Sequence, residues 1–148
     1  MSLKLFPWVD YNRTKGGVKL HVVLDHADYL PRFACVGQVR EHDVRYARQL
    51  QLPKGSIVVI DKGYLDLAMF HRWTTAGVFF VTPEKKKLLY RVVRSKPIPA
   101  AVDIRRDEII QLTGSRGRER YPRRMRRIEL DVVDREGRRR RKVAARAR

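Results

Sequence analysis

The sequence is poor in cysteine and in acidic residues, and it has no long apolar run. Cys35 is the only cysteine, which excludes an intrachain disulfide, and its apolar surroundings favour a small buried thiol over a nucleophile. No apolar stretch approaches the roughly 18 residues of a membrane span, and the first residues lack the organisation of a signal peptide. We therefore expect a reducing, cytoplasmic location and no membrane partner.

Basic residues dominate the charge of the chain. Against 16 Asp and Glu stand 34 Lys and Arg, which gives a net charge of +18 and a pI near 10.9. Residues 116–148 hold 15 of the basic residues and 5 of the acidic ones. Such an excess favours a polyanionic partner, first of all nucleic acid. With 148 residues and 43% apolar side chains, the chain is long enough to bury a core.

The first half of the chain predicts an α/β sheet. Alternating apolar residues in 19–25, a turn at Asp28-Tyr29 and an apolar run in 30–37 predict an antiparallel hairpin. Residues 56–61 form a continuous β-branched run, which is typical of a strand buried on both faces. We predict that this run is the central strand of one sheet that also contains the hairpin, and that residues 78–82 form another buried strand.

Two helices are predicted to cover the sheet. Asp43 is placed to cap a helix that runs to about Leu50. Asp66 is placed to cap a second helix, and Gly77 stands where a left-handed residue ends such a helix.

Beyond Pro83 the sequence changes character. Residues 89–93, 108–112 and 126–133 read as polar strands, and the Arg-rich residues after them have too little apolar surface to fold by themselves. The expected organisation is therefore a partial core in 1–83, a small antiparallel β region in 84–134 and a basic disordered tail in 135–148.

Asp61 is the strongest candidate for chemistry. It stands where the strand at 56–61 gives way to Lys62-Gly63-Tyr64, at the carboxyl end where ligand and metal sites of open α/β sheets gather. The alternative is that Asp61 caps a loop or a helix. His42-Asp43 is either a catalytic pair or a helix cap after a polar residue, and the scattered histidines disfavour a zinc site.

Aromatic and basic residues interleave near the start of the chain. Phe6, Trp8 and Tyr11 alternate with Arg13 and Lys15, a texture compatible with DNA contacts. The alternative is that the aromatic side chains anchor this segment on the sheet.

Several motifs together resemble a known family. They are Leu5 to Trp8, Thr14 to His21, Leu24 to His26, Tyr29 to Pro31, His42-Asp43, Leu52 to Val59, and Asp61 to Tyr64. With this order and spacing, the sequence from about Leu3 to about Val133 resembles the insertion-sequence-four group of DDE transposases.

The resemblance implies an RNase-H-like fold, a mixed sheet with flanking helices and a small inserted β region. In such enzymes three acidic residues hold two divalent cations, Mg²⁺ or Mn²⁺, that cut and rejoin DNA. Asp61 matches the second acid. The implied partners are transposon ends, target DNA and other transposase subunits at the bacterial nucleoid. The expected DNA contacts are Arg13, Lys15, Lys62, Arg138, Arg139, Arg140, Arg141 and Lys142.

Two departures from the family pattern bear on activity. The first acid is expected upstream of Leu3, and the third on a helix with a Tyr, Arg, Glu, Lys signature that does not follow Val133. Residues 135–148 resemble nothing expected at that place. We therefore predict a fragment, incomplete at both ends, that is inactive alone and does not stably bind the cations. The alternative is a basic DNA-binding protein or an inhibitor of intact transposase.

Overall fold

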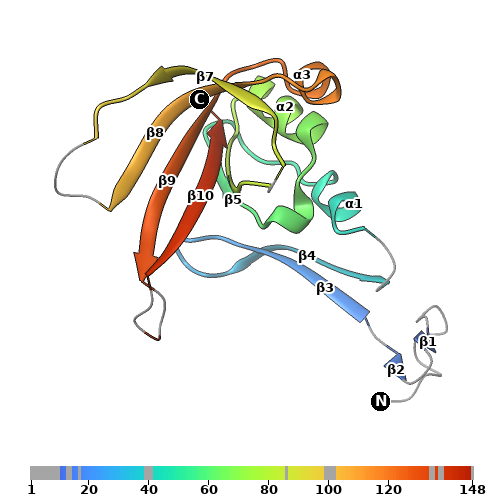
Figure 1. Ribbon diagram of the computed structural model, residues 1–148. Helices are drawn as coiled ribbons and strands as arrows, with labels where there is room; N and C mark the ends of the chain where they lie inside the picture. Colours follow the sequence, from blue (N-terminus) through green and yellow to red (C-terminus); the bar gives the residue numbers. More distant parts are fainter. Residues whose placement is uncertain are drawn as a thin grey trace. The chain divides into compact units, whose positions relative to one another are not determined.

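The computed structural model describes residues 11–12, 15–16, 18–38, 42–85, 87–98, 103–133, 136 and 139–147. The chain divides into two compact units, residues 1–51 and 52–148 (Figure 1). The expected limits at 83 and 134 do not coincide with this division, because strands on both sides of Pro83 belong to one sheet. No helix among the described residues is long and apolar enough to cross a membrane.

The first unit contains the predicted hairpin. Strand β3 (Val18–Leu24) pairs antiparallel with β4 (Pro31–Gln38), and Tyr29 takes a positive φ of 57° in the turn between them. A short pair, β1 (Tyr11–Asn12) and β2 (Lys15–Gly16), precedes it. The hairpin forms a two-stranded sheet of its own, so the prediction that it shares a sheet with the strand after residue 56 is wrong.

Helix α1 (Val44–Ala47) is a single turn and ends before Leu50. Asp43 precedes it but makes no side-chain cap, because its backbone is helical rather than extended as in a capping residue. Its carboxylate instead accepts a hydrogen bond from Lys19 Nζ at 2.9 Å. Tyr46 fixes the turn by stacking on the buried ring of His21, with 4.2 Å between ring centroids. Cys35, on β4, is partly exposed rather than buried.

The second unit is built on one mixed six-stranded sheet (Figure 1). Its first two strands, β5 and β6, are parallel, and every other neighbouring pair is antiparallel. In spatial order the strands are β5 (Ile57–Val59), β6 (Phe79–Pro83), β10 (Arg139–Ala147), β9 (Met125–Val133), β8 (Ile104–Leu112) and β7 (Tyr90–Ser95).

Strand β5 lies at the edge of this sheet, so the prediction of a central strand is wrong. Only Val58 turns into the core, while Ile57 and Val59 are 61% and 80% exposed. A β-branched run favours extended backbone, but its burial depends on which strands pair with it.

Strand β10 corrects the prediction of a disordered tail over residues 139–147. Its backbone pairs with β9 from Arg139 to Ala147 and with β6 at Ala144 to Arg146. Backbone hydrogen bonds to β9 along the whole strand, and to β6 at three residues, hold this arginine-rich segment in the sheet. Residues 135, 137, 138 and 148 lie outside the described residues.

The core of this unit lies between the sheet and two helices. Helix α2 (Leu67–Thr75) packs on β6, and Phe70 stacks on Phe80 with 4.1 Å between ring centroids. The short helix α3 (Ser115–Arg120) packs on β8 and α2.

The predicted ends of α2 are confirmed. The buried Asp66 carboxylate accepts hydrogen bonds from Ala68 N and Met69 N at 2.9 and 3.2 Å. Gly77 has the positive φ, 77°, that a helix end of this kind requires.

Candidate functional site

Asp61 lies just beyond the carboxyl end of β5. Ile60 N still donates to Val81 O at 2.9 Å, which extends the parallel pairing by one residue before the chain leaves the sheet. Asp61 then precedes the 3₁₀ turn η2 (Lys62–Tyr64), and its carboxylate accepts a long hydrogen bond from Gly63 N, at 3.5 Å. Asp61 thus fits both sequence-based alternatives: it follows the end of a strand, and its carboxylate caps a turn.

The Asp61 carboxylate is exposed, so its charge costs little desolvation energy. Two other acidic residues, Asp66 and Asp25, have carboxylates that accept hydrogen bonds from neighbouring residues. Asp66 is buried as the cap of α2. Asp25 accepts a hydrogen bond from Ala27 N and another from Arg32, and these bonds lower the pKa of its carboxyl. Of these three residues, Asp61 is the most exposed.

The donor chemistry of Asp61 fits a hard divalent cation, because Mg²⁺ and Mn²⁺ prefer carboxylate oxygens. The two-metal arrangement needs cations about 3.5–4 Å apart and several ligands to fix them. Among the side chains that the structure describes, no group of three potential ligands gathers at one place. Among the described side chains, Asp61 does not by itself form a complete two-metal site.

The remaining predicted contact residues are only partly described. Lys62 is exposed directly after Asp61. Lys15 lies in β2 and its side chain is outside the described part, as is the whole of Arg13. Arg138 is likewise outside it, and Arg139, Arg140, Arg141 and Lys142 are described only as backbone of β10.

The sequence reasoning missed a buried charged cluster around Arg127. The guanidinium donates to Glu84, Glu108 and Glu129 at 3.0, 3.0 and 3.2 Å, and it lies over the ring of Tyr90, 5.4 Å from the centroid. Burial lowers the pKa of Arg127, but the neighbouring Glu84, Tyr90 and Glu108 more than offset this, so that the pKa lies above its ordinary value.

A sequence signal for this cluster exists in the alternation of charge along two strands. Arg127 and Glu129 are two residues apart on β9, and Glu108 stands opposite Arg127 on β8. Because residues two apart share a face, the period-two pattern places these charges together once the strands are paired.

Comparison with known proteins gives the family. Residues 7–148 match the family described as "Transposase DDE domain". The chain belongs to this family.

One curated relative supports the same class. The chain is 28% identical over 135 residues to "Putative transposase y4zB" of Sinorhizobium fredii (strain NBRC 101917 / NGR234), a match that covers 88% of this chain. The chain spans 38% of the length of that relative. No solved structure matches.

The family match also corrects an expectation about residues 135–148. They were expected to depart from the family, yet the match extends through residue 148. The described part of this segment is strand β10 in the interior of the sheet, which fits a segment that is integral to the domain.

Proposed function

We propose that this chain is a segment of a DDE transposase of the insertion-sequence-four-like group, with an RNase-H-like core. The observation that carries the proposal is the placement of Asp61, exposed just beyond the end of β5, in a chain of the transposase DDE family. The substrates are transposon ends and target DNA, and the place of action is the nucleoid.

In this proposal Asp61 is one of three carboxylates that hold two divalent cations, Mg²⁺ or Mn²⁺. Bound cations supply activation of the attacking water or 3′ hydroxyl and stabilisation of the leaving oxygen. The other two carboxylates come from residues outside this stretch, or from another transposase subunit. Asp25 and Asp66 are not assigned to the set, because the Asp66 carboxylate is buried as a helix cap and the Asp25 carboxylate is paired with Arg32.

The basic residues near Asp61 position the DNA backbone. Lys62 follows Asp61 directly and is exposed, so its ammonium can reach a phosphate next to the carboxylate. Arg13 and Lys15 are proposed as further phosphate contacts from the first unit, and Arg138 to Lys142 as contacts from the segment that leads into and forms β10.

The test is Mg²⁺-dependent nicking of supercoiled plasmid DNA. We expect no nicking above background from the 148-residue chain alone, and nicking from a longer transposase or chimera that contains this segment. In that longer protein Asp61→Asn should lower the nicking rate by about 100-fold or more, since loss of a cation ligand removes several kcal/mol of transition-state stabilisation. Asp103→Asn is the matched control, because Asp103 is exposed and lies away from η2 in the sequence.

Two results would contradict the proposal. Nicking by the longer protein that survives Asp61→Asn would remove Asp61 from the catalytic set. Robust nicking by the isolated chain that Asp61→Ala abolishes would show that another acid of these 148 residues completes the site.

A further inference from the structure

A group of six exposed arginines surrounds helix α3 and the adjoining strand β7. It is separate from the residues proposed above to contact DNA, and we refer to it as the α3 arginine cluster. Its members are Arg91, Arg116, Arg118, Arg120, Arg123 and Arg124.

Helix α3 is fixed by its inner face, which leaves its arginines on the outside. Gly117 faces β8, because a Cβ added to it would lie 3.5 Å from Leu112 Cδ1, an ordinary contact distance. One turn later Tyr121 is fully buried, and its hydroxyl lies 3.1 Å from Thr74 Oγ1 of α2. With Gly117 and Tyr121 facing inward, the arginines of the same turn point to solvent.

Hydrogen bonds tie the remaining members to the same platform. Arg91 Nη2 donates to Gln111 Oε1 at 3.2 Å, and Gln111 Nε2 donates to Pro122 O at 3.4 Å. Gln111 therefore joins β7 to the segment that carries Arg123 and Arg124. The cluster is held on secondary structure and does not depend on a flexible tail.

The charges of this cluster are uncompensated. Elsewhere in the unit, Arg105, Arg126 and Arg127 each pair with carboxylates at 3.2 Å or less. Within the described part of the chain no ion pair involves any of the six arginines, and the sole acid in the segment from Ser115 to Arg124 is Glu119. Clustered like charges repel one another, so such a surface is suited to an anionic partner.

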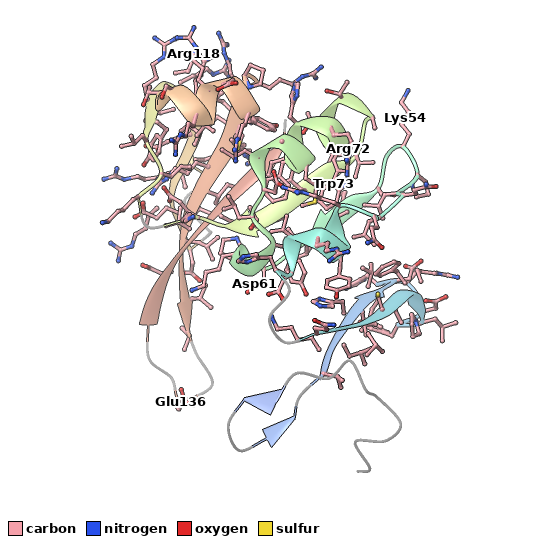
Figure 2. All side chains as sticks on the ribbon, turned by 90° about the vertical axis from the view of Figure 1, so that its right-hand side faces the viewer. Lys54, Asp61, Arg72, Trp73, Arg118 and Glu136 are labelled. Carbon is pink, nitrogen blue, oxygen red and sulfur yellow. The ribbon has the colours of Figure 1, made fainter. Side chains whose placement is uncertain are left out.

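We propose that the α3 arginine cluster binds the sugar-phosphate backbone of duplex DNA, as a contact additional to those proposed above. The inference rests on the proposed function, which supplies DNA as the polyanion. Guanidinium groups bind phosphate oxygens through paired N–H donors, and contacts of this kind position DNA without reading its sequence. Arg118 and Asp61 lie in different parts of the unit in Figure 2, so the cluster holds DNA and takes no part in cleavage.

The experiment compares two triple variants of the full chain in binding to a fluorescent DNA duplex over a range of salt concentrations. Arg116→Gln, Arg118→Gln and Arg120→Gln together remove three charges of the cluster. Lys54→Gln, Lys85→Gln and Lys87→Gln together remove three exposed charges elsewhere and serve as the matched control. Thermal melting of both variants checks that the fold is kept.

The arginine variant should flatten the plot of log affinity against log salt by up to about 2.7, since each phosphate contact contributes about 0.9. The lysine variant should leave the slope near that of the unchanged chain. Replacing the same three arginines by lysine keeps the charge and should largely restore the slope.

Several outcomes would overturn the inference. Equal slopes for the arginine variant and the unchanged chain would reject the cluster while leaving the proposed function intact. Failure of the unchanged chain to bind DNA at all would reject the cluster and leave the cleavage test to decide the proposed function. Loss of binding in the lysine-for-arginine variant would point to a structural role and would also overturn the inference.

Discussion

Replacing Arg127 by methionine should destabilise the protein strongly. The Arg127 side chain is 9% exposed, and its guanidinium pairs with three carboxylates on separate segments: Glu84 after β6, Glu108 on β8 and Glu129 on β9. Methionine keeps much of the aliphatic volume but leaves the three acids close together and without their shared cation. Removing one partner of a buried ion pair costs about 3–5 kcal/mol, because the remaining charge stays desolvated.

The loss can be measured by urea unfolding followed by circular dichroism. With an m-value of about 2 kcal/mol per molar urea, a loss of about 4 kcal/mol moves the midpoint down by about 2 M. The destabilisation should be greatest near pH 7 and should shrink in acid, because protonation of the glutamates removes the uncompensated negative charge.

The matched control is Arg105→Met. Arg105 donates to Asp131 at 2.6 Å, but its side chain is 58% exposed, so water screens the pair and the loss should stay below about 1 kcal/mol. Equal midpoints for the two variants at pH 7, or a loss for Arg127→Met that does not depend on pH, would refute the reasoning from burial.

Three further variants test local features of the second unit. Gly77→Ala and Gly55→Ala should each lower the free energy of unfolding by about 1–2 kcal/mol because of their positive φ. Thermal melts should show the larger loss for Gly77→Ala, since its Cβ would lie 2.8 Å from Lys54 Cγ while Gly55 has open space. Equal losses of stability would exclude the steric contribution. Asp107→Asn should cost about 1.5 kcal/mol at pH 7. The hydrogen bond from Arg126 lowers the pKa of the Asp107 carboxyl, against the effect of burial. Its contribution to stability is therefore present above about pH 4, the ordinary pKa of the unfolded group, and is lost as the pH falls through the lower folded pKa. A difference in stability from the unchanged protein that persists in strong acid would contradict this prediction.

Local sequence signals predicted the elements that depend on local interactions. The β3–β4 hairpin follows from alternating residues on either side of a short turn, and α2 follows from a capping aspartate and a terminal glycine. Both sets of interactions lie within a few residues of one another, so they can be read before the fold is known.

The position of a strand within a sheet could not be read in the same way. The apolar run of β5 predicted a strand correctly but not its place at the edge, and the arginines of β10 hid a strand altogether. In both cases the deciding interactions are with strands distant in sequence. The same limit applies to the site proposed at Asp61: its strand-end position follows from neighbouring residues, whereas the further ligands that a two-metal site requires are not local in the sequence.

The place of β10 has a consequence for how the domain folds. Strands β6 and β9 are both neighbours of β10, and Pro83 stands opposite Ala144, 61 positions later. During synthesis, the β5–β6 pair and the β7–β8–β9 meander are made first, and they become one sheet only when residues 139–147 enter between them (Figure 1). Pairing across so long a loop is slow. Until it occurs, β6 and β9 each expose an open edge that another chain can occupy. We therefore expect this domain to be most prone to aggregate before β10 is added.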